Sequence, residues 1–141
     1  MVLTGGLNIW TMPLAAAVSF AFGAVWYAAL SRPWRVASRI DPGAAATSPP
    51  PAMLAATFLA QLVMAWLLAQ LLLNLRLAGF QVSAASGMAA AAVLWFGFIL
   101  MPLLVNNMYQ RAPLMLSIID GAHWLGVMVL QGAVLGALAL R

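Results

Sequence analysis

Two titratable residues, Asp120 and His123, stand three positions apart in the last apolar segment of the chain. At about 100° per residue they share one helix face with Ser117 and Gln131. A carboxylate inside a membrane helix costs on the order of 3 kcal/mol, so another group must compensate for it. The pair is suited to relaying a proton or binding an ion; alternatively, His123 or an amide of the preceding helix simply satisfies the carboxyl. The sequence leaves both interpretations open.

A second group of polar and aromatic residues is predicted at the same end of the molecule. Asn106 and Asn107 close the third apolar segment just after Pro102, which removes a helical donor and predicts irregular backbone. Trp26 and Tyr27 end the first apolar segment. With the carboxylate described above, these side chains would form a polar pocket facing the cytoplasm. The alternative is helix capping together with an interfacial belt of aromatic rings.

Several other chemistries are disfavoured by composition. The chain has one His and no Cys, so His123 is a weak candidate for a haem or chlorophyll ligand, and we expect no cofactor and no metal. It contains neither a Gly-x-Ser-x-Gly turn nor a cluster of metal ligands, so we expect it not to be an enzyme. The net charge of +4 is spread over separate helix ends, which argues against nucleic-acid binding.

The elements that position these residues are predicted to be membrane helices. Of the 141 residues 66% are hydrophobic and 6% charged, and the mean hydropathy is +1.05, which excludes a soluble domain. A segment of about 20 apolar residues spans the hydrocarbon layer. We therefore predict a single all-α domain over residues 1–141, an integral membrane bundle of four transmembrane helices running up-down-up-down with short loops. The helices are expected at about 6–30, 52–75, 83–105 and 113–140, with a cytoplasmic loop at 31–51.

The distribution of arginine predicts the orientation in the membrane. All six basic residues are arginine. Four of them fall on one side, which should be cytoplasmic, and two on the other: Arg32, Arg35, Arg39 and Arg111, against Arg76 and Arg141. Both termini are then expected to be periplasmic in a multi-pass protein of the bacterial inner membrane.

Glycines on the last helix predict close packing. Gly132 and Gly136 form a GxxxG pair, and Gly121 lies within about 60° of them on the helix wheel. Small residues let two helix backbones approach closely, either within the bundle or between protomers of a homo-oligomer. Packing within the bundle is the simpler expectation.

The residues also resemble those of a known family, the small bacterial membrane proteins of domain of unknown function 1761. The resemblance covers almost the whole chain and rests on the following residues: Asn8, Gly23-Ala24-Val25-Trp26-Tyr27, Trp34, Asn106-Asn107, Ile119-Asp120-Gly121 and the segment from Gly132 to Gly136. Relatives often carry Gly-Lys just before the Trp of the first loop, where this chain has Ser31-Arg32-Pro33. The resemblance implies four spans and marks Asp120, Asn106, Asn107, Trp26 and Tyr27, but it supplies no activity. Gly23 is a further candidate for a helix-packing position.

Two hypotheses of function follow from the sequence. In the first, the protein handles a small solute, ion or proton at the cytoplasm-facing polar pocket and associates with itself. In the second, it is an accessory or structural subunit of a larger membrane complex. The lipid bilayer is a partner in both.

Overall fold

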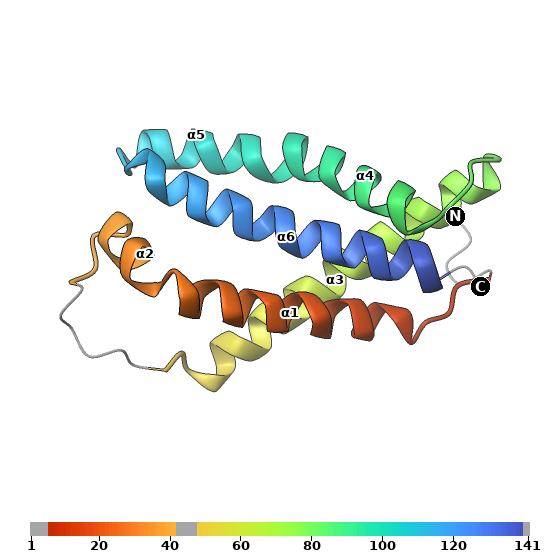
Figure 1. Cartoon of the computed structure of the whole chain (residues 1–141), viewed down its shortest axis with the longest axis horizontal. Helices are drawn as coiled ribbons and strands as arrows, with labels where there is room; N and C mark the ends of the chain where they lie inside the picture. The colour runs from red at the N-terminus through yellow and green to blue at the C-terminus, as the bar shows by residue number, and fades with distance from the viewer. Residues whose placement is uncertain (1–5, 42–47, 140–141) are drawn as a thin grey trace.

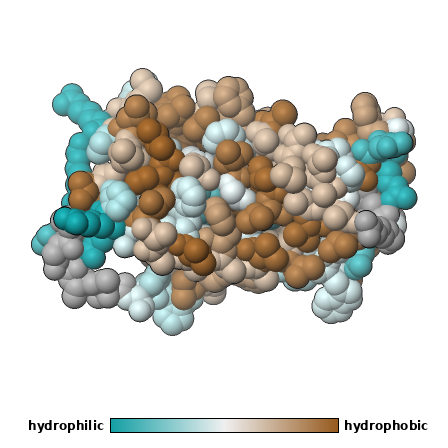
Figure 2. Space-filling model, in the orientation of Figure 1, coloured by the Kyte–Doolittle hydropathy of each residue, from teal (hydrophilic) through white to brown (hydrophobic). Residues whose placement is uncertain are grey.

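The computed structural model describes residues 6–41 and 48–139, and these form helices and connecting turns (Figure 1). Among them, four helical stretches are long and apolar enough to cross a membrane: Thr11–Ala29 (α1), Pro51–Leu77 (α3), Ala84–Tyr109 and Leu114–Leu138 (α6). Consecutive stretches run in opposite directions, with an apolar band between more hydrophilic ends (Figures 1 and 2). The predicted all-α fold with four transmembrane helices is therefore confirmed.

The first helix begins at Thr11, later than the predicted start near residue 6. The Asn8 side chain accepts a hydrogen bond from the Trp10 N–H at 3.2 Å, and the Thr11 hydroxyl donates to the Asn8 carbonyl at 2.6 Å. This local turn competes with the helix because asparagine readily bonds the backbone two residues on. The Asn8 N–H also donates to the Ala139 carbonyl at 2.8 Å, which joins the start of α1 to the end of α6.

The loop predicted at 31–51 is wrong in its first part, where Ser31–Ala37 form a short helix (α2) directly after α1. Pro33 does not prevent this helix, because residues of the first turn have no helical partner for their N–H groups. The helix ends where Arg39 adopts a positive φ of 58°. The predicted end of the last helix at residue 140 lies outside the described residues.

The third span contains an irregular segment, as the position of Pro102 predicts. The α-helix Ala84–Leu94 (α4) passes into the π-helix Trp95–Leu100 (η1), and Met101–Tyr109 (α5) completes the span. Pro102 has no N–H to offer to the carbonyl four residues earlier, so the hydrogen-bond ladder shifts locally to the wider spacing.

The predicted end of this span at about residue 105 is wrong, because α5 continues to Tyr109. Asn106 and Asn107 thus lie within its last turns. The helix is closed instead by a turn at Arg111, which has a φ of 52°, and the Ala112 N–H donates to the Asn107 carbonyl at 2.9 Å. This turn satisfies the last carbonyls without an asparagine cap.

Helix α6 is the centre of the bundle and packs against α1, α3 and α4 (Figure 1). A side chain on Gly132 would collide with the Gly87 carbonyl oxygen of α4, and one on Gly136 with the Ser83 carbonyl oxygen. The two backbones therefore touch directly. The glycine pair packs within the chain, as expected.

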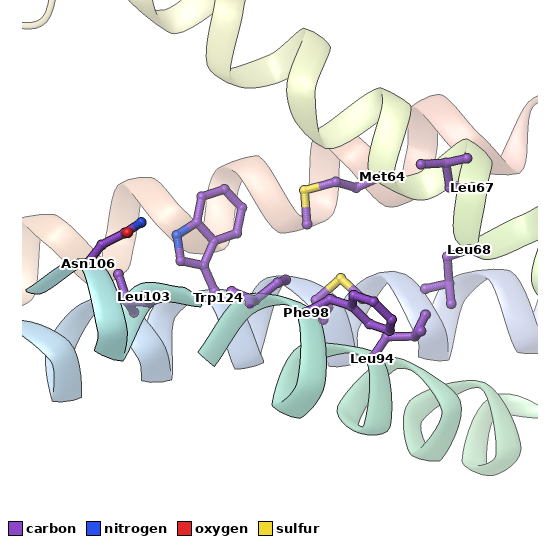
Figure 3. A pocket seen from close by; sticks show the side chains of 10 residues that line it. Met64, Leu67, Leu68, Leu94, Phe98, Leu103, Asn106 and Trp124 are labelled. Carbon is purple, nitrogen blue, oxygen red and sulfur yellow. The ribbon is translucent and has the colours of Figure 1, made fainter. Parts of the chain in front are cut away.

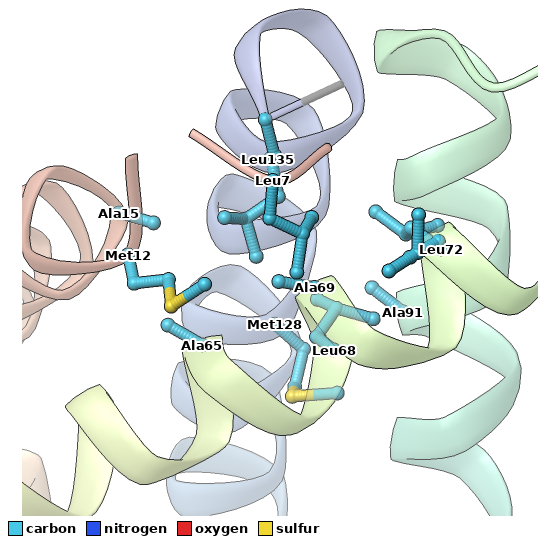
Figure 4. Packing of buried hydrophobic residues seen from close by; sticks show 12 residues of the cluster. Leu7, Met12, Ala15, Ala65, Leu68, Ala69, Leu72, Ala91, Met128 and Leu135 are labelled. Atoms are coloured by element: carbon cyan, nitrogen blue, oxygen red, sulfur yellow. The ribbon is translucent and has the colours of Figure 1, made fainter. Parts of the chain in front are cut away.

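The buried apolar core lies where α1, α3, α4 and α6 meet (Figure 4). Its helices approach closely because several of the core residues are alanines with no exposed surface: Ala15, Ala65, Ala69 and Ala91. Leu72 of α3 and Leu135 of α6 fill the remaining space and are likewise fully buried. Close packing of this kind is the main source of helix association in lipid.

Candidate functional site

Asp120 is held by two hydrogen bonds from other elements. The Tyr27 hydroxyl, near the end of α1, donates to Asp120 Oδ1 at 2.8 Å, and Trp34 Nε1 of α2 donates to the same oxygen at 3.0 Å. The two rings meet edge to face, with centroids 5.5 Å apart. Hydrogen bonds to a charged acceptor are the stronger kind, and they offset the cost of placing a carboxylate here.

These partners differ from the predicted ones. One of the two interpretations left open by the sequence had His123 or an amide of the preceding helix satisfy the carboxyl, but its hydrogen bonds come from Tyr27 and Trp34 instead. The reason lies in α2, which turns back against α6 and brings the indole of Trp34 to Asp120. A loop at this place, as predicted, would have given no fixed position for that indole.

His123 is buried in an aromatic environment next to Asp120. Its side chain is 4% exposed and neither ring nitrogen has a hydrogen-bond partner among the described residues. The imidazole lies against Tyr27, with centroids 4.7 Å apart, and against Trp124 at 5.1 Å, and it stacks on Phe22 at 6.1 Å. Buried polar groups normally have a partner, so an unpaired imidazole requires a physical explanation.

Trp26 Nε1 is a second buried donor without a partner among the described residues. Its ring packs on Phe22, with centroids 5.6 Å apart, at the same end of α1 as the imidazole. We name the group Asp120, His123, Tyr27, Trp34 and Trp26 the Asp120 cluster. It combines one carboxylate, unpaired ring nitrogens and aromatic walls.

The surroundings of His123 do not fit a haem or chlorophyll. A side-chain carbon added at Gly23 would lie 2.8 Å from His123 Nε2, so this nitrogen faces the backbone of α1. A porphyrin ring coordinated through Nε2 would need the volume that α1 occupies. Gly23 thus makes room for the imidazole, which is its packing role.

Among the described residues, no hydrogen bond joins the asparagines or Ser117 to the Asp120 cluster. Asn107 Nδ2 donates to Ser117 Oγ at 2.9 Å in a buried contact between α5 and α6. Asn106 lines a groove instead. The residues predicted to form one polar pocket thus make different contacts: Asn107 bonds Ser117, whereas Asn106 lines the groove together with Trp124, which lies against His123.

That groove has a volume of about 540 Å³ and lies between α3 and the third span, with α6 as its floor (Figure 3). Met64 and Leu67 form one wall, Phe98 of the π-helix contributes to the other, and Trp124 lies between them (Figure 3). Asn106 is the only polar amide in its lining. The groove is mainly apolar and is therefore suited to lipid chains or an apolar helix.

Gln131 belongs to a different polar network, deeper in the bundle. Its Nε2 donates to Ser19 Oγ and to the Gln61 carbonyl, each at 3.0 Å, and the Ser19 hydroxyl donates to Gln61 Oε1 at 2.7 Å. Although Gln131 shares a helix face with Asp120, eleven residues correspond to roughly 16 Å along the axis. The network fastens α1, α3 and α6 to one another.

Gly121 connects the site to the irregular part of the third span. Trp95, the first residue of η1, donates from Nε1 to the Gly121 carbonyl at 2.9 Å. Leu100 lies against the same glycine, since an added side-chain carbon would stand 3.2 Å from its Cδ1. The residue after Asp120 is thus fixed by η1, and π-helical turns are frequent at functional sites.

Sequence reasoning missed two members of these arrangements. Trp34 was noted as part of the resemblance, but not as a donor to Asp120. Ser19 gave a weaker signal, a lone hydroxyl midway along an apolar segment. Both residues carry hydrogen-bond donors, and their positions in the sequence relative to the predicted helices place them near the membrane depth of the acceptors that they contact.

Comparison with protein families gives the context for this site. The family model described as a protein of unknown function (DUF1761) matches residues 10–136. The chain belongs to this family. No curated protein and no solved structure matches it. The matched range includes every residue of the Asp120 cluster, and the DUF1761 assignment agrees with the resemblance read from the sequence.

Proposed function

We propose that this DUF1761 protein binds and moves a proton or another small cation at the Asp120 cluster. One observation carries the proposal: a carboxylate and a buried imidazole without a partner among the described residues lie together in the first half of α6. Leaving a buried polar group unpaired costs about 1–3 kcal/mol, and a cation bound to the free lone pair of the imidazole would offset part of this cost. Ionisable residues within membrane spans commonly mark ion and proton pathways.

The cluster offers the right chemistry for a cation. Asp120 supplies negative charge, and its Oδ1 is already oriented by Tyr27 and Trp34. The faces of the surrounding indole and phenol rings attract cations. We propose that this role is non-enzymatic, in keeping with the sequence prediction.

Replacing Asp120 by asparagine tests the proposal. Asparagine keeps an oxygen that accepts from Tyr27 and Trp34 but cannot take up a proton at physiological pH. Purified wild-type protein in liposomes loaded with a pH-sensitive dye should pass protons under an imposed potential, and Asp120→Asn should abolish this flux while remaining folded. Asp41→Asn, the same change at the only other acidic residue, is the matched control and should retain the flux. Equal flux through wild type and Asp120→Asn would refute the proposal.

The membrane and the orientation are part of the proposal. We infer a location in the bacterial inner membrane with both termini periplasmic, because the arginines of α2 and Arg111 lie at one end of the bundle and Arg76 at the other. A reporter that is active only in the periplasm should work when fused after residue 141 and fail when inserted at residues 42–47. The reverse pattern would overturn the orientation.

A second function is favoured by the lateral groove. Its apolar lining and its opening between α3 and the third span are suited to a helix of another membrane subunit. The homo-oligomer also stays a prediction, and the glycine pair does not support it because those glycines contact α4 of the same chain. Native gels after mild detergent extraction separate these states: migration with larger subunits supports the accessory role, and migration as a multiple of this chain supports self-association.

A further inference from the structure

A second cavity lies at the end of the bundle that carries α2, outside the Asp120 cluster. It has a volume of about 400 Å³ and opens between α2 and the beginning of α6. Five of its lining residues are apolar and one is charged: Arg32, Pro33, Val36, Ala37, Pro113 and Met115. We call it the α2 slot. An apolar slot with one guanidinium on its wall matches a molecule with an apolar chain and an anionic head.

The charges around the α2 slot are strongly unbalanced. At this end of the bundle, the described residues outside the long helices include four arginines and one aspartate, which give a net charge of +3. These residues are Arg32, Arg35, Arg39, Arg111 and Asp41. Arg32 makes no hydrogen bond or ion pair with another described residue, so its guanidinium is free to bind an external anion.

Side-chain hydrogen bonds hold the walls of the slot in place. Arg39 Nη2 of the segment after α2 donates to the Arg111 carbonyl at 2.6 Å, which joins that segment to the turn before α6. Trp34 fixes the opposite face of α2 through Asp120. The slot is therefore shaped before any ligand arrives, which lowers the entropic cost of binding.

The position of the slot at the end of a membrane-spanning helix favours a lipid as its ligand. α2 begins at Ser31, two positions after the last residue of α1, so the slot lies at the end of an apolar span, where a bilayer places its headgroups. Val36 is 58% exposed and Met115 52% exposed on the slot surface. A free phosphate would leave both side chains in water, whereas a phospholipid covers them with its acyl chain.

We propose that the α2 slot binds an anionic phospholipid, with the lipid phosphate on Arg32 and the first part of one acyl chain along Val36 and Met115. Basic pockets beside transmembrane helices bind anionic lipid heads by the same combination of charge and apolar contact. A single arginine near an anionic headgroup contributes about fivefold to lipid affinity.

The test is lipid retention by the purified full chain. The protein is mixed in mild detergent with equal amounts of phosphatidylglycerol and phosphatidylcholine of identical acyl chains, and bound lipid is counted by native mass spectrometry. Wild type should retain phosphatidylglycerol in preference to phosphatidylcholine. Arg32→Gln should lower phosphatidylglycerol retention about fivefold, and Arg32→Lys should restore most of it.

Arg76→Gln is the matched control, because it removes the same charge at the other end of the bundle and should leave retention unchanged. Met115→Ser tests the acyl contact independently of charge and should also weaken retention. Equal retention of both lipids, an unaffected Arg32→Gln variant, or an equal loss in Arg76→Gln would overturn the proposal. Full displacement of phosphatidylglycerol by inorganic phosphate would show a simple anion site and would overturn it as well.

Discussion

Replacing Gly132 by alanine tests the direct backbone contact between α4 and α6. The added carbon would lie 2.9 Å from the Ala91 Cβ and still closer to the Gly87 carbonyl oxygen, whereas ordinary contacts of such a carbon begin at 3.4 Å. The helices must therefore separate by at least 0.5 Å along this line. Backbone atoms cannot rotate away as a side chain can, so the whole contact has to open.

The expected loss of stability in Gly132→Ala follows from this separation of the two helices. A gap of about 0.5–1 Å forfeits a quarter to a half of the dispersion energy of each atom pair across it. Overpacking of this kind costs about 1–3 kcal/mol. Alanine also stabilises a helix by about 1 kcal/mol relative to glycine. Gly132→Ala must therefore be compared with another glycine-to-alanine variant that has the same benefit but no clash.

Gly97→Ala is that control, because a side-chain carbon there meets nothing within 4 Å. The free energy of unfolding should be measured in lipid bicelles with increasing sodium dodecyl sulfate, followed by tryptophan fluorescence. Gly132→Ala should be less stable than Gly97→Ala by about 1–3 kcal/mol. Gly87→Ala should cost a similar amount, and the double variant should cost less than the sum, because both carbons open the same gap. A difference within about 0.5 kcal/mol between Gly132→Ala and Gly97→Ala would refute the reasoning.

Two further predictions concern stability and use the same unfolding assay. Gln131→Leu should destabilise the protein by about 1–3 kcal/mol, because it removes a donor to Ser19 and to the Gln61 carbonyl in a buried place; an unchanged stability would contradict the network. Arg111→Gly should be more stable than Arg111→Ala by about 1 kcal/mol, because φ is 52° at this residue and only glycine adopts it without strain. Equal stability of these two variants would show that the turn is not strained.

The membrane fold was predictable because it depends on properties that are local in sequence. A run of about 20 apolar residues must satisfy its backbone hydrogen bonds internally, so length and hydropathy alone predict a spanning helix. Pro102 predicts disturbed backbone in the third span for an equally local reason, its missing N–H, and η1 precedes it. Gly132 and Gly136, four positions apart, similarly predict a smooth helix face, and α4 packs on it.

The partners of Asp120 were decided only by the tertiary structure. Tyr27 and Trp34 are 93 and 86 positions away in sequence, and their approach depends on how α1 and α2 rotate and slide against α6. The helix wheel places Gln131 and Asp120 on one face but gives no distance along the helix axis. The sequence therefore grouped these two residues, although they belong to different polar networks in the structure. The unpaired nitrogens of His123 likewise follow from the packing of Gly23 and Tyr27 around the ring. Sequence thus determined which groups enter the membrane, whereas packing between distant helices determined which of them meet.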